Sequence, residues 1–237
     1  MTTIESNLQG VRKRVQQACA AAGRDVTEVT LMAVSKTFTA DAVRQAQAAG
    51  QRVFGENYVQ EGVEKICALR SSPEGAGLEW HCIGPLQSNK TRLVAEHFDW
   101  VQSVDRLRIA QRLSEQRPEG LAPLQVCLQV NVDGGANKSG VAPGELLALA
   151  QAVDRLPRLR LRGLMSVPEP VDGFDAQRAV FLQVRDLFDD LKSRGFELDT
   201  LSLGMSDDLD AAVAAGSTMV RVGRAIFGSR PARETSA

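Results

Sequence analysis

The sequence predicts a single TIM-type (β/α)₈ barrel with one extra N-terminal helix before the first strand. The length of 237 residues is normal for one such barrel. Eight short apolar runs rich in β-branched residues alternate with longer stretches of helical character, which is typical of βα units around a parallel sheet. No Pro-, Ser- or Gly-rich linker divides the chain, so we expect one domain over 1–228 and a frayed C-terminal tail over 229–237.

The extra helix is predicted over Ile4–Ala22, and the barrel units follow it in order. The predicted strands are Val29–Ser35, Arg52–Phe54, Leu78–Ile83, Trp100–Val104, Leu124–Val132, Leu159–Met165, Thr200–Leu203 and Met219–Val222. The helical segments between them are Ala40–Ala49, Val59–Leu69, Asn89–Phe98, Arg106–Gln116, Gly144–Leu156, Ala176–Arg194 and Asp207–Ala215. Periodicity alone does not exclude an open doubly wound sheet, but eight units in one uninterrupted chain favour a closed barrel.

The composition is that of an ordinary soluble globular protein, with 43% hydrophobic and 24% charged residues. A formal net charge of −1 and an aromatic content of 5% argue against a broad nucleic-acid or membrane surface. The four cysteines and two histidines lack the spacing of a metal site or a disulfide framework, so we expect mostly buried, reduced thiols. The absence of a signal peptide and of a membrane-spanning run favours the cytoplasm, and the lack of a long exposed apolar helix face favours a monomer.

Polar residues and glycines directly follow the predicted strands, at the end of a barrel where ligand sites lie. These strand ends collect Lys36, Asn57, Ser166, Ser206, Arg221 and Gly223 on one rim. This convergence predicts a binding site at that rim.

Lys36 is the candidate nucleophile, because it directly follows the apolar run that begins at Leu31. Partial desolvation in a barrel mouth disfavours the charged form of a lysine and lowers its pKa. A neutral amine can attack an aldehyde to form an imine. The alternative is an ordinary solvated lysine at a strand end.

The strand-to-helix segment around Ser206 and the pair Gly223–Arg224 form a candidate phosphate site. Barrels often bind phosphate with the loops after strands seven and eight, through backbone N–H groups and hydroxyls. The alternative for Ser206 is ordinary N-capping of the helix that begins at Asp207. Asp207 and Asp208 would repel a phosphate, so we expect their side chains to point away.

Arg221 shares a strand face with Gly223, which points it into the barrel. A buried arginine is costly unless it is paired. Its partner could be a ring nitrogen or carboxylate of a ligand, or an internal carboxylate such as Glu56. His81 is expected to be a core or rim histidine with satisfied hydrogen bonds.

Five motifs resemble the pyridoxal phosphate homeostasis protein family. They are Val34–Thr37, Phe54–Glu61, Trp80–Lys90, Leu203–Leu209 and Val220–Gly228. They occur in order along nearly the whole chain. The resemblance implies the barrel fold of the N-terminal domain of alanine racemase, with pyridoxal 5′-phosphate (PLP) bound. One departure is the loop Asp133–Gly140, where family members usually carry more acidic residues.

The resemblance also implies a role for each candidate residue. Lys36 would carry PLP as a Schiff base. Ser206, Gly223 and Arg224 match the phosphate-binding positions, Arg221 matches the arginine beside the pyridine nitrogen, and Asn57 matches a cofactor-facing position.

An enzyme and a carrier are the two main functions to weigh. Racemisation needs PLP as an electron sink and two bases on opposite faces of the substrate carbon. In alanine racemase the second base is a tyrosine from an additional β domain, for which the sequence has no room after the eighth strand, and Tyr58 is the only tyrosine here. An arginine beside the pyridine nitrogen keeps that nitrogen unprotonated and weakens the electron sink.

We therefore expect a non-catalytic carrier or buffer in intracellular PLP homeostasis, which supplies the cofactor to PLP-dependent apo-enzymes. One alternative is a PLP-dependent amino-acid racemase. Another is a barrel that binds some other phosphorylated metabolite, with Lys36 unmodified.

Overall fold

The computed structural model describes residues 3–70, 75–134 and 139–229, and these form a closed barrel of parallel strands. The strands are β1 (Thr30–Val34), β2 (Val53–Glu56), β3 (Glu79–Cys82), β4 (Trp100–Val104), β5 (Leu124–Gln129), β6 (Leu159–Met165), β7 (Thr200–Ser202) and β8 (Met219–Val222). They pair in sequence order, and β8 closes the barrel on β1. The predicted fold class is therefore confirmed.

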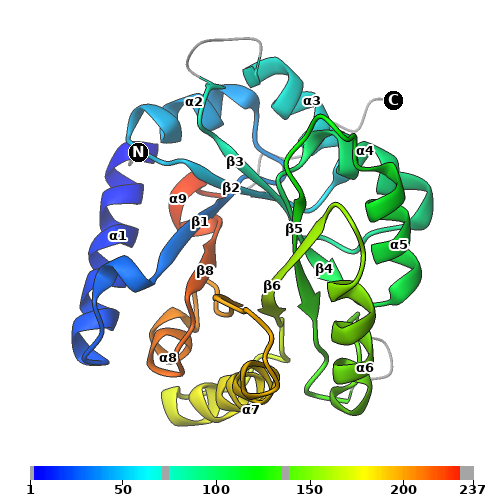
Figure 1. Cartoon of the computed structure of the whole chain (residues 1–237). Helices are drawn as coiled ribbons and strands as arrows, with labels where there is room; N and C mark the ends of the chain where they lie inside the picture. The colour runs from blue at the N-terminus through cyan, green and yellow to red at the C-terminus, as the bar shows by residue number, and fades with distance from the viewer. Residues whose placement is uncertain (1–2, 71–74, 135–138, 230–237) are drawn as a thin grey trace, which may run out of the picture.

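The helices surround the barrel, as Figure 1 shows, with α1 lying beside the β1 and β8 side of the ring. They are α1 (Ile4–Ala21), α2 (Ala40–Ala48), α3 (Val59–Arg70), α4 (Thr91–His97), α5 (Leu107–Gln116), α6 (Pro143–Asp154), α7 (Phe174–Ser193), α8 (Leu209–Ala214) and α9 (Arg224–Phe227). Two short 3₁₀ helices, η1 (Val26–Glu28) and η3 (Ser88–Lys90), complete them. Glycines Gly23, Gly50, Gly195 and Gly216 adopt positive φ after α1, α2, α7 and α8 and end those helices.

Two strand boundaries differ usefully from the prediction. β2 continues to Glu56, beyond the predicted end at Phe54, because Gly55 and Glu56 pair with β3. A glycine and a carboxylate are poor strand signals, so the sequence pattern does not reveal this extension. β5 ends at Gln129 rather than Val132, and the chain beyond it makes an isolated bridge from Val130 instead of a ladder.

The helices around β7 and β8 also differ from the prediction. The helix expected over Asp207–Ala215 begins only at Leu209, so Ser206 is not its N-cap. The short helix α9 directly after β8 was not predicted. Both differences lie in the loops that the sequence assigns to phosphate binding.

The core lies between the barrel and its helices, where apolar side chains such as Phe54 and Trp80 are fully buried with their rings 5.5 Å apart. Cys19, Cys82 and Cys127 are buried and Cys67 is exposed, all as reduced thiols, which agrees with the expectation. Burial raises the pKa of Cys82 and Cys127 to about 12, which makes those thiols unreactive.

Within the described part of the chain, no helix is long and apolar enough to cross a membrane. Residues 135–138 of the Asp133–Gly140 loop and residues 230–237 of the predicted tail lie outside the described residues.

Candidate functional site

The ends of four adjacent strands bring the predicted site residues to one edge of the barrel. β7, β8, β1 and β2 are consecutive in the closed sheet. Lys36 follows β1, Asn57 follows β2, Ser206 follows β7, and Arg221, Gly223 and Arg224 lie on or directly after β8. This edge is formed by the carboxyl ends of the strands, where barrel enzymes and binding proteins hold their ligands.

The strand register aligns Lys36 with Asn57. Val34 pairs with Gly55, and the backbone N–H of Ser35 donates to the carbonyl of Gly55 at 3.0 Å. Lys36 and Asn57 each lie two residues further along, so they leave the sheet at the same level. Both side chains are half-buried.

The turn after Lys36 is held in an unusual conformation. Thr37 has φ of 69°, which is in the left-handed region and is unfavourable for a β-branched residue. The carboxylate of Glu61 on α3 accepts the backbone N–H of Thr37 at 2.6 Å. The ammonium of Lys65, also on α3, donates to the carbonyl of Ser35 at 2.7 Å. Helix α3 therefore fixes the backbone on both sides of Lys36.

Lys65, Glu56 and Glu61 form a buried ionic cluster beneath this turn. Lys65 Nζ lies 2.8 Å from Glu56 Oε1 and 2.6 Å from Glu61 Oε1, so its three N–H donors all have acceptors, the third being the carbonyl of Ser35. Burial raises the pKa of Glu56, although Lys65 and the Ser35 hydroxyl oppose that rise. The sequence pattern does not reveal this cluster, because the i,i+4 spacing of Glu61 and Lys65 is also that of an ordinary surface pair.

Arg221 is buried in the barrel and binds neutral acceptors. Its Nη1 donates to the carbonyl oxygen of Ser202 at 2.6 Å and to the Ser202 hydroxyl at 2.7 Å, and its Nη2 donates to the carbonyl of Ser166 at 2.9 Å. Burial lowers the pKa of Arg221 to about 10. Among the described residues no carboxylate forms a salt bridge with it, and Glu56, the internal partner considered from the sequence, pairs with Lys65 instead.

The loops after β7 and β8 carry groups suited to an anion. Gly223 packs so closely on β1 that a Cβ atom there would lie 3.0 Å from the carbonyl oxygen of Val34. The first backbone N–H groups of a helix lack intrahelical partners, and in α9 these belong to Arg224 and Ala225, because Ile226 and Phe227 both donate to the carbonyl of Gly223. Asp208 turns its carboxylate back onto its own loop, where Oδ1 accepts the backbone N–H of Met205 at 2.5 Å. Ser206 is half-buried and Arg224 is exposed.

Helix α1 stabilises the loops after β7 and β8, and the sequence pattern does not predict this. Arg14 donates to the backbone carbonyl of Ser206 and pairs with Asp210 at 2.6 Å. The side-chain amide of Asn7 donates to the carbonyl of Ile226 in α9 at 2.9 Å. No sequence signal marks these contacts, because they join residues about two hundred positions apart.

Two buried polar atoms beside Lys36 have no hydrogen-bond partner among the described residues. They are Oδ1 of Asn57 and Oγ1 of Thr37. Buried polar groups are normally paired, so unpaired ones at a strand-end site point to a polar ligand. Together with Arg221 and the loops after β7 and β8, they suit a polar ligand that carries an anionic group.

His81 lies inside the barrel rather than at the mouth. It is fully buried, its Nε2 lies 2.7 Å from Glu79 Oε1, and its Nδ1 lies 3.0 Å from Gln102 Nε2. Burial lowers its pKa although Glu79 opposes the shift. The expectation of a core histidine with satisfied hydrogen bonds is confirmed.

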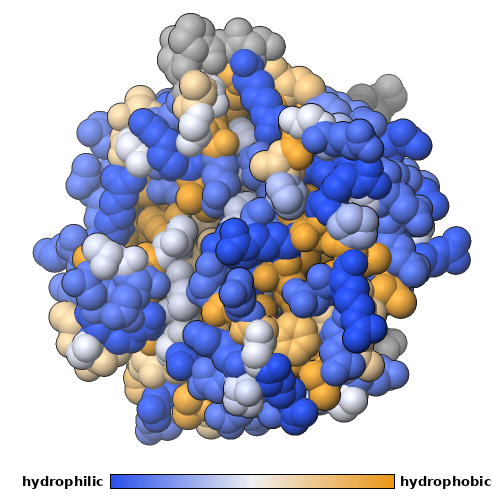
Figure 2. Space-filling view, in the orientation of Figure 1, coloured by the Kyte–Doolittle hydropathy of each residue, from blue (hydrophilic) through white to orange (hydrophobic). Residues whose placement is uncertain are grey.

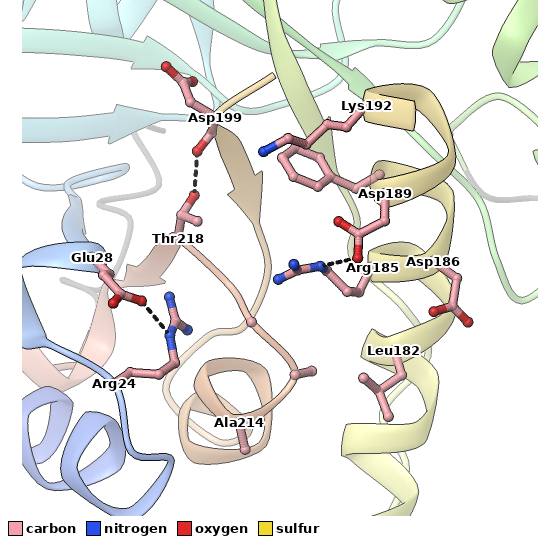
Figure 3. A pocket seen from close by; sticks show the side chains of 13 residues that line it. Arg24, Glu28, Leu182, Arg185, Asp186, Asp189, Lys192, Asp199, Ala214 and Thr218 are labelled. Carbon is pink, nitrogen blue, oxygen red and sulfur yellow. Dashed lines mark hydrogen bonds and ion pairs between the residues drawn. The ribbon is translucent and has the colours of Figure 1, made fainter. Parts of the chain in front are cut away.

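The outer surface offers a different kind of hollow at the opposite end of the barrel. A depression of about 700 Å³ lies between α7, α8 and the residues that precede β7 and β8. Figure 3 shows two ion pairs in it, Arg24 with Glu28 at 3.0 Å and Arg185 with Asp189 at 2.7 Å. Figure 2 shows hydrophilic residues over much of the visible face, with hydrophobic ones between them. Four of its charged side chains are therefore already paired with one another.

Comparison with known proteins agrees with this geometry. A family model described as the N-terminal domain of alanine racemase matches residues 6–231. A relative in Pseudomonas aeruginosa called pyridoxal phosphate homeostasis protein is 60% identical over 230 residues, which are 97% of each chain. The protein of that name in Escherichia coli K12 is 56% identical and matches over 97% of this chain and 98% of its own.

Solved structures give the same result. PipY of Synechococcus elongatus PCC7942, solved with PLP bound, is 38% identical with a TM-score of 0.78, over 90% of this chain and 100% of its own. Alanine racemase from Corynebacterium glutamicum is 18% identical with a TM-score of 0.66, over 96% of this chain and 62% of its own. At that identity the second likeness concerns the fold alone.

Proposed function

Because the chain belongs to the family of alanine racemase N-terminal domains, and its close relatives are called pyridoxal phosphate homeostasis proteins, we propose that it binds PLP and acts in PLP homeostasis. The cofactor is held as a Schiff base on Lys36 and is later released. The amine of Lys36 adds to the aldehyde carbon of PLP, and one water leaves as the imine forms.

The observation that carries this proposal is the position of Lys36 after β1, between the loops that follow β7 and β8 and the end of β2. On one side lie the loops of Ser206, Gly223 and Arg224, and on the other side Asn57 presents an unpaired oxygen. Arg221 supplies the guanidinium that suits the ring nitrogen. The PLP-bound PipY structure, which matches over most of the chain, supports the same ligand.

Each residue has a role that follows from its chemistry. The Ser206 hydroxyl and the backbone N–H groups of Gly223 and Arg224 bind the phosphate, because N–H and O–H donors suit an anion. The Asn57 side chain faces the cofactor. Arg221, which is always charged, keeps the pyridine nitrogen unprotonated by donating to its lone pair.

The binding is non-catalytic in this proposal. When bound, PLP supplies an electron sink, but an unprotonated ring nitrogen weakens it, and racemisation also needs a second base. The single tyrosine, Tyr58, lies in the loop before α3 and is 49% exposed rather than enclosed in the barrel mouth. We further propose a cytoplasmic monomer that passes PLP to apo-enzymes, and sedimentation of the purified protein checks the monomer.

The decisive experiment is the absorbance spectrum of the purified protein with added PLP. We expect a yellow protein, from which borohydride reduction followed by peptide mass analysis recovers the cofactor attached to Lys36. Lys36→Ala should lose the band, while Lys192→Ala on the distant helix α7 should keep it.

Two outcomes would contradict the proposal in different ways. A protein that stays colourless with excess PLP would favour another phosphorylated ligand. Racemisation of an amino acid at ordinary enzyme rates would favour the racemase alternative.

A further inference from the structure

A series of hydrogen bonds through buried side chains links Arg221 to the amino end of the barrel strands. Arg221 itself donates to the hydroxyl of Ser202 at 2.7 Å. That hydroxyl in turn donates to Oε1 of Gln102 at 2.8 Å. Ser202 and Gln102 lie on β7 and β4, on different sides of the barrel interior, and neither is exposed.

The orientation of the Gln102 amide is fixed by what surrounds it. Its Nε2 lies 3.0 Å from the sulfur of Met219 and 3.0 Å from Nδ1 of His81, while its Oε1 faces the donating hydroxyl of Ser202. Nε2 carries two hydrogens and so has an acceptor for each. The reversed amide would place its oxygen against the Met219 sulfur, which has no hydrogen to donate.

This orientation determines the tautomer of His81. Because Nδ1 accepts from Gln102, the ring proton lies on Nε2 and is donated to the carboxylate of Glu79 at 2.7 Å. Glu79 is the first residue of β3, at the amino end of the strands, and its side chain is 42% exposed. The ring of His81 stacks on Trp100 with centroids 5.0 Å apart, which holds it in plane.

All the donors in this chain of hydrogen bonds point the same way. The chain runs from the cation Arg221 through Ser202, Gln102 and His81 to the anion Glu79. Hydrogen bonds arranged head to tail polarise and strengthen one another, most of all in a buried setting. The chain therefore compensates a buried guanidinium without bringing a carboxylate next to it.

We propose that Ser202, Gln102 and His81 are positioning residues that hold Arg221 against the ring nitrogen of PLP and so determine how tightly the ring end of the cofactor is bound. The inference rests on the proposed function and on Arg221 as the ring-nitrogen partner. A carboxylate in place of this series of hydrogen bonds would also hold Arg221. It would, however, occupy N–H donors of the guanidinium and neutralise the charge that acts on the ring nitrogen of PLP. Neutral acceptors leave the charge of Arg221 directed toward the ligand.

The test compares two ligands that differ at the ring nitrogen. The dissociation constants of PLP and of 1-deaza-PLP, in which C–H replaces that nitrogen, are measured by absorbance titration for the wild type and for Gln102→Leu. The substitution removes all three hydrogen bonds of the Gln102 amide at similar volume. We expect it to weaken PLP roughly five- to tenfold, and the deaza analogue by no more than about twofold.

A matched control separates this effect from general damage. Gln51 is also a buried glutamine, and its amide donates to the carbonyls of Leu31 and Val53 at 2.8 Å. It takes no part in the series of hydrogen bonds from Arg221 to Glu79. Gln51→Leu should change the affinities for both ligands by the same factor. If Gln102→Leu does not fold, the same two ligands are compared with Ser202→Ala, which removes a single hydroxyl. Ser114→Ala on α5 is then the control.

The possible outcomes are distinct. Equal weakening of PLP and 1-deaza-PLP, or no weakening of either, would overturn the positioning role while leaving PLP binding intact. A wild type that binds neither ligand would instead overturn the proposed function, and the positioning role with it.

Discussion

At Gly223 the close packing of the backbone bears directly on the proposed binding of the phosphate. A Cβ atom at this position would lie 3.0 Å from the Val34 carbonyl oxygen and 3.4 Å from the Val34 Cβ, closer than ordinary van der Waals contact. An added methyl group must therefore push β8 and α9 away from β1. Since the N–H groups of this loop are the proposed phosphate donors, a shift of a few tenths of an ångström lengthens those hydrogen bonds.

We expect Gly223→Ala to weaken PLP binding on the order of tenfold, the equivalent of one charge-assisted hydrogen bond, while the protein stays folded. Fluorescence or absorbance titration of PLP measures the effect. Gly120→Ala, at a loop glycine with no atom within 4 Å of the added Cβ, is the control and should leave the affinity unchanged. Unchanged binding by the Gly223 variant would mean that the phosphate lies elsewhere.

At the scale of the elements, helix α3 positions the ends of strands β1 and β2 through Lys65. Lys65 of α3 neutralises the fully buried Glu56 of β2 and also holds the carbonyl of Ser35 before the Lys36 turn. Removing one partner of a buried ion pair leaves an uncompensated charge, at a cost of about 3–5 kcal/mol. Removing both partners costs much less.

Lys65→Met should therefore lower the free energy of unfolding by about 3 kcal/mol. Glu56→Gln introduced into the same protein should restore part of that loss, since no buried carboxylate then lacks its counter-ion. Urea unfolding of the wild type, both single variants and the double variant gives the coupling energy. Simple addition of the two single effects would show that the pair does not act as a unit.

All eight strands were predictable from sequence, although several of their ends were not, and neither were the loops and buried ionic contacts. Runs such as Trp100–Val104 carry a strong period and β-branched content, so β4, β6 and β8 begin and end as predicted. Lys36 and Arg221 were predicted as site residues because strand ends in a barrel converge. The short helix α9 and the late start of α8 follow from local packing of Gly223 and Asp208, which a propensity pattern does not contain.

Long-range polar contacts were the part that sequence could not supply. Arg14 and Asn7 on α1 reach loops near the other end of the chain, and Gln102 reaches Ser202 across the barrel. Each of these side chains is unremarkable in its own segment. Their partners become neighbours only once the barrel closes.

At the scale of the whole molecule, the polar interior of the barrel makes stability depend on pH. His81 is buried in the neutral form with Nδ1 as an acceptor, so a second ring proton would face the Gln102 amide donor. Burial accordingly lowers its pKa below the ordinary value of 6.5. Below that pH the unfolded chain binds a proton at His81 that the folded chain does not, so stability falls as pH falls. Glu56 acts in the opposite direction, because burial raises its pKa and the folded chain takes up that proton first.

We expect the free energy of unfolding of the PLP-free protein to fall as the pH falls below about 6.5, with a His81 contribution of at most about 1.4 kcal/mol per pH unit. His81→Gln should be less stable near neutral pH, because it loses the Glu79 and Gln102 hydrogen bonds, yet it should lose less stability over this interval. Urea unfolding at several pH values measures both slopes, and subtracting them removes the contribution of Glu56 and the other carboxylates. His97→Gln, which removes the other histidine of the chain, is the matched control. Equal slopes for the wild type and His81→Gln would show that His81 titrates alike in the folded and unfolded chains, against the buried neutral form that the hydrogen bonds require.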